Sequence, residues 1–214
     1  MARIFIVSIL ISLLISCVKK KNISFESYFI DTNKGKVNYR LFESINDSLF
    51  HRIIIRQDIK RISERKLEIV YYWMNEDSIP FSQGKEIISE YSIEFLESSI
   101  FEFDNNSNET TKIKSTSKSN NYWNLLNNKN QSFDFEYKND WIDYQVKSNA
   151  TAVFKDTLGV NSLILYGNEK TKIIKGKETK NFISKSIRIF QLNKGLVYFN
   201  QNTNGDFSEY SLIE

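Results

Sequence analysis

The chain is poor in four residue types that build metal sites or interrupt regular structure. Among its 214 residues are one cysteine, one histidine, one proline and seven glycines. A single cysteine excludes an intrachain disulfide and a thiolate zinc cluster, and a single histidine excludes a histidine-rich metal site. Scarce proline and glycine argue against wholesale disorder. The fold must therefore depend on a hydrophobic core, and we expect no metal and no cofactor.

Common catalytic motifs are also missing. The sequence has no G-x-S-x-G turn, no Walker loop and no H-E-x-x-H motif. The lone histidine, His51, lies in the apolar segment LFHRIIIR. There a packed or edge histidine is favoured over a member of a catalytic triad. We therefore predict no catalytic residues.

Carboxylates are numerous, so any pair of them is weak evidence for catalysis. Glu90, Glu94 and Glu136 would form an acid–base set only if the fold brought them together in a cleft. Their alternation with apolar neighbours predicts instead that they lie on a solvated sheet face. A carboxylate-dependent hydrolase is the third of our functional hypotheses.

The charge of the chain is nearly balanced. There are 29 basic and 26 acidic residues, and the formal net charge is +3. This value gives no general attraction to nucleic acid, so no nucleic-acid partner is expected. One segment is locally basic, through Arg52, Arg56, Lys60, Arg61, Arg65 and Lys66. Because Ile54 and Asp58 share a strand face with the first three of these, a solvated face is favoured over a site for anionic head groups.

The longest uncharged apolar run lies at the N-terminus. Residues 4–15 carry no charge and follow Arg3. Twelve helical residues rise about 18 Å, whereas a bilayer core needs roughly 30 Å. A positive start, a short apolar run and small residues at its exit are typical of a secretory signal peptide.

The end of this run is more specific. Leu14-Ile15-Ser16-Cys17 resembles the lipobox of bacterial lipoproteins. The resemblance implies that residues 1–16 form a signal peptide, that the Cys17 thiol carries a diacylglycerol, and that the new amine usually carries a third acyl chain, such as palmitate. Two or more chains anchor a protein stably to a membrane. The alternative is an uncleaved signal-anchor, which the three lysines after Val18 partly favour.

The clearest fold pattern is period-two alternation of apolar and polar residues. It runs through residues 23–29, 37–41, 67–73, 91–95, 101–103, 133–137 and 142–146. Residues 171–174 and 182–190 suggest two more strands, and residues 195–213 suggest a hairpin. Such alternation is typical of antiparallel sheets with one buried face. We predict an all-β fold with a mainly antiparallel, curved sheet after the signal helix. A half-barrel, a barrel and a sandwich remain open, because all three alternate alike.

The predicted organisation is simple. Residues 17–22 form the acylated cysteine and a tether, and residues 23–214 form a single β-rich domain. Within it, the Asn/Ser/Lys-rich segment at about 104–131 predicts a polar loop, with room for one helical turn at Asn121–Leu126. Asn204-Gly205 predicts the turn of a C-terminal hairpin, and Lys175-Gly176-Lys177 predicts another turn.

Three tripeptides share an acceptor-like pattern: Asp47-Ser48-Leu49, Asp77-Ser78-Ile79 and Asp156-Thr157-Leu158. They resemble the Asp-Ser/Thr-apolar motif for O-glycosylation of exported proteins in some Gram-negative bacteria. The resemblance implies glycans on Ser48, Ser78 and Thr157. Chance occurrence in a serine-rich chain explains them equally well.

Taken together, the lipobox, a Lys-Gly-Lys turn before a strand and the final hairpin resemble uncharacterised envelope lipoproteins of Gram-negative bacteria. Some of these have curved sheets similar to half-barrels that carry lipids or lipoproteins. In one such family, acidic residues after the acylated cysteine direct proteins to the cell surface. Because Val18 and three lysines follow Cys17 here, we expect a lipid anchor in the outer membrane facing the periplasm.

The leading functional hypothesis is a non-enzymatic, membrane-anchored envelope lipoprotein that binds a protein partner or an apolar ligand. The alternative is a lipid or lipoprotein carrier, which needs an aromatic-lined cavity in a curved sheet. A partner-binding module needs an exposed apolar patch or an open sheet edge. A hydrolase needs carboxylates that converge in a cleft and have shifted pKa values.

Overall fold

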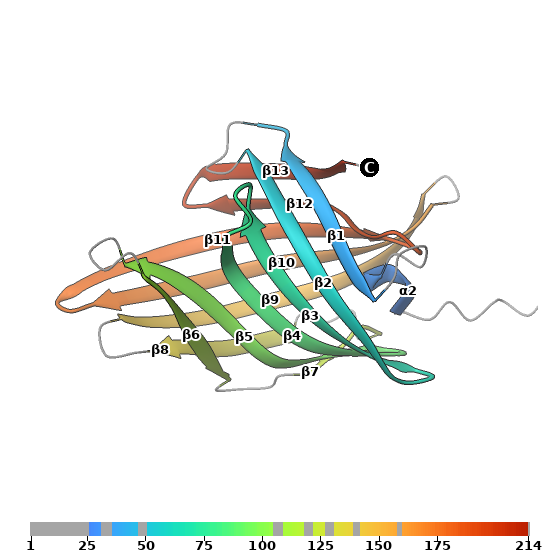
Figure 1. Cartoon of the computed structure of the whole chain (residues 1–214), viewed down its shortest axis with the longest axis horizontal. Helices are drawn as coiled ribbons and strands as arrows, with labels where there is room; N and C mark the ends of the chain where they lie inside the picture. Colours follow the sequence, from blue (N-terminus) through green and yellow to red (C-terminus); the bar gives the residue numbers. More distant parts are fainter. Residues whose placement is uncertain are drawn as a thin grey trace, which may run out of the picture.

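The computed structural model describes residues 26–30, 36–46, 51–104, 109–117, 122–126, 131–138, 142–157 and 160–213. These residues form a short helix and thirteen strands (Figure 1). The elements are α2 (Glu26–Phe29), β1 (Val37–Ser44), β2 (Arg52–Ser63), β3 (Lys66–Asn75), β4 (Pro80–Ser89), β5 (Ser92–Asp104), β6 (Glu109–Ser117), β7 (Tyr122–Asn124), β8 (Gln131–Lys138), β9 (Ile142–Thr157), β10 (Val160–Lys175), β11 (Glu178–Gln191), β12 (Gly195–Thr203) and β13 (Asp206–Ile213).

The sheet closes on itself as a β-barrel. Its order is β4-β3-β2-β1-β13-β12-β11-β10-β9-β8-β6-β5-β7, with every pair antiparallel. Pairing of β4 with β5 completes a ring of twelve strands, and the short β7 adds to the edge of β5. The predicted all-β, antiparallel fold is confirmed, and of the three open architectures the barrel is the observed one. Closure removes the unpaired edges that an open sheet exposes.

Register across the strands divides the residues between an inner and an outer face. Phe42 on β1 lies opposite Ile53 on β2, and both are buried inside the barrel. Arg56 and Asp58, on the other face of β2, point outward and form an ion pair of 2.9 Å. Successive strand residues face opposite sides of a sheet, so this register assigns each strand residue to one face.

The short helix α2 packs on the core at one end of the barrel. Phe29 of α2 contacts Phe190 with ring centroids 4.9 Å apart, and Tyr28 contacts Phe154 at 5.8 Å. Beneath them lie fully buried aliphatic side chains, including Leu163. Figure 1 shows α2 at this end of the barrel, with the β10–β11 and β12–β13 turns at the other end. The barrel is therefore closed at one end by a helical turn.

Turn residues behave as their types require. Asn204 and Gly205 have φ values of 53° and 101° and join β12 to β13, which confirms the predicted hairpin. Gly176 has a φ of 60° between β10 and β11, so the second predicted turn is also confirmed. Glycine reaches these positive φ values without steric strain.

Two sequence-based predictions of local structure are wrong. The extended segment predicted over residues 23–29 is helical at Glu26–Phe29, because these residues cap the barrel end and pair with no strand. The polar loop predicted over 104–131 contains β6 at Glu109–Ser117 and β7 at Tyr122–Asn124. β7 also replaces the helical turn expected at Asn121–Leu126. Polar residues form strands here because their backbone groups complete the ladder with β5 and β8.

Candidate functional site

The barrel interior contains three adjoining cavities that meet at one side chain, Arg188 of β11. Their volumes are about 270, 210 and 480 Å³, and Arg188 lines all three. The register places Arg188 between Leu165 on β10 and Phe199 on β12. Because Arg188 faces inward yet is exposed to solvent, the interior is open to water.

One wall of the first cavity is aromatic. Phe95 of β5 lies 5.2 Å from Phe133 and 6.4 Å from Phe135, both on β8, measured between ring centroids. Trp123 of β7 lies 5.9 Å from Phe133 and fills the seam between β5 and β8. Val146, Ala150 and Leu165 continue the apolar lining. This wall offers a surface for an apolar molecule.

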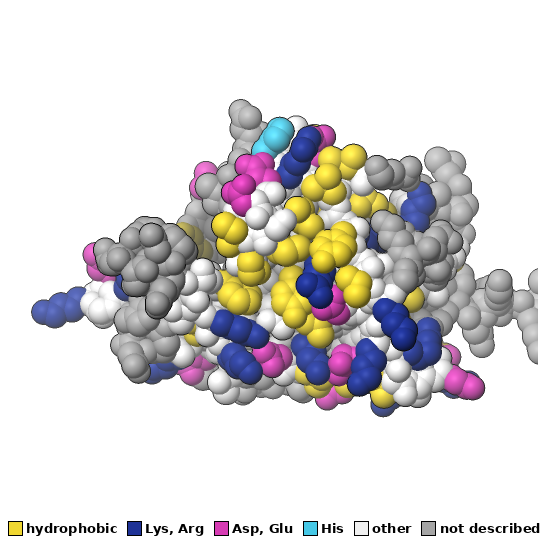
Figure 2. All heavy atoms as spheres, in the orientation of Figure 1, with side chains coloured by type: hydrophobic (Ala, Val, Ile, Leu, Met, Phe, Trp, Pro, Cys, Tyr) yellow, Lys and Arg dark blue, Asp and Glu magenta, His cyan; other side chains and the backbone are white. Residues whose placement is uncertain are grey.

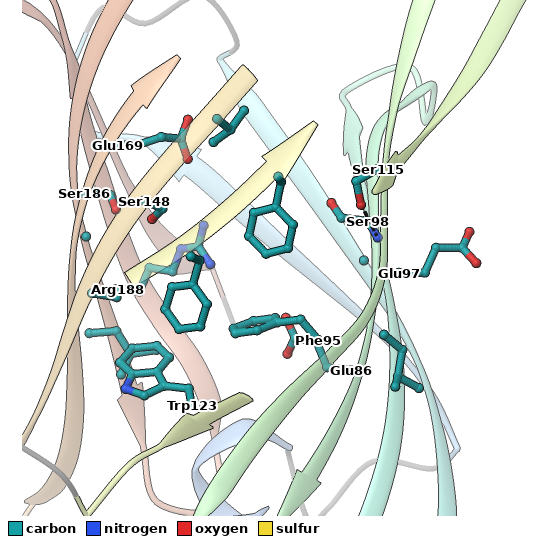
Figure 3. Close-up of a pocket in the computed structure, with 18 of the residues that line it drawn as sticks. Glu86, Phe95, Glu97, Ser98, Ser115, Trp123, Ser148, Glu169, Ser186 and Arg188 are labelled. Carbon is teal, nitrogen blue, oxygen red and sulfur yellow. Dashed lines mark hydrogen bonds between the residues drawn. The ribbon is translucent and has the colours of Figure 1, made fainter. Parts of the chain in front are cut away.

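Arg188 is the main positive group in the cavities. Figure 3 shows its side chain extending from β11 toward the aromatic residues. Its guanidinium carbon lies 5.6 Å from the centre of the Trp73 ring, a cation–π distance. Within the described part of the chain it forms no ion pair and no hydrogen bond. A guanidinium carries five N–H donors, so Arg188 can still bind an acceptor group.

Glu86 of β4 is a carboxyl group inside the same space. It lies opposite Ile69 on β3 and Phe95 on β5. Burial raises its pKa to about 7, and the nearby Arg188 and a hydrogen bond from Tyr71 partly offset that rise. Glu86 therefore keeps its proton to a higher pH than an ordinary carboxyl group does.

Some buried polar atoms in the interior have no partner among the described residues. The indole Nε1 of Trp123 has no acceptor, although the side chain is only 4% exposed. Closer to α2, the side-chain amide of Asn38 and the Oε1 atom of Gln57 also lack partners. Buried polar groups usually have hydrogen bonds, so these atoms are places where a bound molecule or water could be recognised.

The end of the barrel away from α2 is polar. The largest cavity is lined there by hydroxyl and amide side chains from β11, β12 and β13. Gln201 Nε2 donates to Ser184 Oγ at 2.8 Å, and Thr203 Oγ1 donates to the same atom at 3.1 Å. This end of the interior thus presents hydroxyl and amide groups to the largest cavity.

The three carboxylates considered as the acid–base residues of a hydrolase do not converge in a cleft. Glu90 lies at the β4–β5 turn and accepts from Arg65 at 3.1 Å. Glu94 and Glu136 alternate with the inward Phe95 and Phe135, so they lie on the outer face, as their alternation predicted. Three other glutamates, Glu86, Glu97 and Glu169, line the first cavity, and Figure 3 shows Glu86 and Glu169 well apart and Glu97 pointing away from both.

The other predicted residues fall in several places. Arg3, Leu14, Ile15, Ser16, Cys17 and Ser48 lie outside the described residues. Ser78 is exposed in the β3–β4 turn, and Thr157 is the last residue of β9. His51 is exposed just before β2, and its carbonyl accepts from the Ser44 backbone at 2.9 Å. Glycosylation and acylation stay predictions.

Sequence reasoning missed Arg188, Glu86 and Trp123. Arg188 shares its strand face with Ser184 and Ser186, so this face resembled a solvated outer surface. Trp123 lies within the segment predicted as a loop. One pattern could have indicated an inner cavity: an isolated arginine on the same strand face as the buried Phe190.

The outer face of β1, β2 and β3 carries an exposed apolar patch. Tyr39 is 57% exposed and Val37 is 49% exposed, with Ile54 and Tyr72 beside them on β2 and β3. Figure 2 shows apolar side chains gathered on this side of the molecule. The Arg56 guanidinium lies 5.3 Å from the Tyr72 ring centre and 6.0 Å from that of Tyr39. The patch is a second candidate for binding.

Within the described residues, no helix is long and apolar enough to cross a membrane, and no group of three or more metal-ligating side chains occurs. No protein-family model and no curated protein matches the chain. A solved structure with a similar strand arrangement is a protein from Parabacteroides distasonis described as a "putative lipoprotein". It is 13% identical, the match covers 86% of this chain and 96% of that one, and the TM-score is 0.48. Such values are too low to indicate what this chain binds.

Proposed function

We propose that this protein is a lipid-anchored envelope protein that binds a small, largely apolar molecule inside its β-barrel, without catalysis. The observation that carries the proposal is the aromatic-lined cavity inside the closed ring of strands. Binding sites for small molecules are concave and mostly apolar, with a few polar groups that set orientation. The wall of Phe95, Phe133 and Trp123, with Arg188 facing it, has that composition.

Cavity size favours a small ligand over the acyl chains of a lipoprotein. Sites for drug-sized molecules measure about 300–1,000 Å³. Of the individual cavities here, those of about 270 and 210 Å³ lie below that range, and the one of about 480 Å³ lies in its lower half. A carrier of several acyl chains would need a larger continuous space.

The envelope location rests on the sequence. The lipobox-like Leu14–Cys17 supports acylation, and Val18 with the lysines after it supports an outer-membrane anchor facing the periplasm. A tethered barrel would hold its ligand close to the membrane surface.

A side chain placed in the cavity tests the binding role. A Cβ atom on Gly84 would meet only Tyr71 Cδ2, at 3.8 Å, so Gly84→Ala fits and Gly84→Leu extends into the space. We expect the uncharged fluorescent probe N-phenyl-1-naphthylamine to bind the wild type and Gly84→Ala alike. Gly84→Leu should weaken that binding at least tenfold. Equal binding by all three chains would contradict the proposal.

The exposed patch supports a second candidate, a protein partner bound at the outer face of β1–β3. A photo-crosslinking amino acid at position 39 should then give a discrete cross-linked species in cells. The matched position is Ile183, an apolar residue on the outside of β11 that is 55% exposed. Cross-linking at position 39 but not at 183 supports this candidate, and no cross-link at 39 argues against it.

A further inference from the structure

We infer that the ligand of the barrel is an amphipathic anion, whose negative group binds Arg188 and whose apolar body lies against the aromatic wall. This inference rests on the proposed function of the same cavity and adds the chemical class of the ligand. Three features of the interior support it: an unpaired cation, an excess of unpaired donors, and an apolar surface within reach of both.

The first feature is the state of Arg188. It projects into the space where the three cavities meet, between Leu165 and Phe199, and no described carboxylate lies within ion-pair distance of it. Its planar guanidinium can hold a carboxylate or phosphate through two parallel hydrogen bonds. A cationic ligand would instead be repelled by it.

The second feature is the balance of donors and acceptors around the first cavity. Both of its inward carboxyl groups already accept hydrogen bonds, Glu86 from Tyr71 and Glu169 from Thr171 Oγ1 at 2.9 Å. The Arg188 guanidinium and the Trp123 Nε1–H have no acceptor. The Trp123 N–H is a buried donor without a partner, which is unfavourable, whereas the solvent-exposed Arg188 can exchange its water for a ligand. A molecule that supplies acceptor oxygens is therefore the complementary ligand.

The third feature is the surface next to these donors. Trp123 contributes both an unpaired N–H and a ring face, and its ring packs at 5.9 Å from Phe133. Figure 3 shows Arg188, Trp123 and Phe95 around one space. A molecule with an oxygen-bearing anionic end and a short apolar chain can satisfy the donors and cover the rings at once.

The expected head group is a carboxylate, because it carries a single negative charge. Glu86 and Glu169 line the same cavity as Arg188. Two nearby carboxyl groups would repel the second charge of a phosphate monoester more than the single charge of a carboxylate. Phosphate shares the same acceptor chemistry, so the experiment must separate the two.

Equilibrium dialysis with three eight-carbon probes tests the inference. The full-length chain is held in lipid nanodiscs, with empty nanodiscs as the reference, and octanoate, octyl phosphate and octanol are compared. We expect octanoate to bind at least tenfold more tightly than octanol. Arg188→Gln should reduce octanoate binding to the octanol level while leaving octanol unchanged. The control Lys185→Gln removes the same charge from the outward face of the same strand and should change neither.

Each outcome has a defined meaning. Equal binding of octanoate and octanol to the wild type, or octanoate binding that Arg188→Gln leaves unchanged, overturns the inference. Tighter binding of octyl phosphate, lost in Arg188→Gln, supports an anion and identifies phosphate as its head group. If N-phenyl-1-naphthylamine binds but octanoate does not, this inference fails and the cavity function stands. If no probe binds, both fail. Retained N-phenyl-1-naphthylamine binding by Arg188→Gln shows that the variant is folded.

Discussion

Single residues inside the barrel have properties that depend on barrel closure. Glu86 is such a residue, because β3 and β5 flank it and β11 brings Arg188 near it. On an open sheet its carboxyl group would be hydrated. Inside the barrel, loss of hydration raises its pKa to about 7.

This shift predicts the pH dependence of stability. The folded protein holds the Glu86 proton more tightly than the unfolded chain, whose carboxyl has an ordinary pKa of 4.5. The contribution of Glu86 to stability is therefore lost as pH rises from about 4.5 to about 7. Glu86→Gln should raise the free energy of unfolding at pH 8 by about 3 kcal/mol and change it little at pH 4.

Urea denaturation at both pH values measures this effect. The control Glu178→Gln removes a carboxylate from an exposed position at the β10–β11 turn. If the two substitutions changed the free energy of unfolding equally at pH 8, burial would not be raising the pKa of Glu86.

Gly195 is a second residue whose role follows from tertiary contact. Its φ is 73°, and a Cβ atom there would lie 3.0 Å from Arg40 Nη2. Arg40 is 2% exposed and donates from Nη1 to the Leu196 carbonyl, so it has little room to move. Gly176 has a similar φ of 60° with nothing within 4 Å of its Cβ position.

The two glycines therefore form a matched pair. Gly195→Ala should lower the free energy of unfolding by roughly 2–4 kcal/mol, from backbone strain plus crowding against Arg40. Gly176→Ala should lower it by about 1 kcal/mol, from backbone strain alone. Chemical denaturation measures both variants. If Gly195→Ala and Gly176→Ala lost similar amounts of unfolding free energy, the Arg40 side chain would be moving away from the new Cβ atom readily.

At the scale of elements, alternation predicted strands well where one face is apolar. The strand β3 is an example, with Leu67 and Ile69 buried on its inner face. The full lengths of β9 and β10 were not predicted. Their inward positions include Ser148, Ala150 and Gly167, which line a cavity and give no hydrophobic alternation.

The helical turn α2 is a short element with a large packing role. Phe29 is 2% exposed and packs on Phe190, whereas Phe207 on the outside of β13 is 42% exposed. Phe29→Ala should lower the free energy of unfolding by about 3–4 kcal/mol through the cavity it leaves. Phe207→Ala should lower it by less than about 1 kcal/mol. Thermal or urea unfolding measures both, and equal losses would mean that α2 does not contribute to the core.

At the scale of the whole molecule, the proposed lipid anchor can be tested independently of the barrel. Cells fed labelled palmitate should label the wild-type chain and a Val18→Ala control, and Cys17→Ala should take up no label, because the acyl chains attach through Cys17. The mass of the isolated wild-type chain should also lack residues 1–16. Label on Cys17→Ala, or an intact N-terminus on the wild type, would contradict the lipoprotein prediction.

The sequence by itself determined the β-class of the chain, its hairpin turns and the outward placement of Glu94 and Glu136. Each of these depends on neighbours within a few residues, through the period of two and the positive φ of Asn204 and Gly205. Only the tertiary structure decided that the sheet closes, that α2 caps one end, and that Arg188, Glu86 and Trp123 line one interior. These features join residues far apart in the chain, and local alternation does not show whether a sheet closes or which residues then meet inside it.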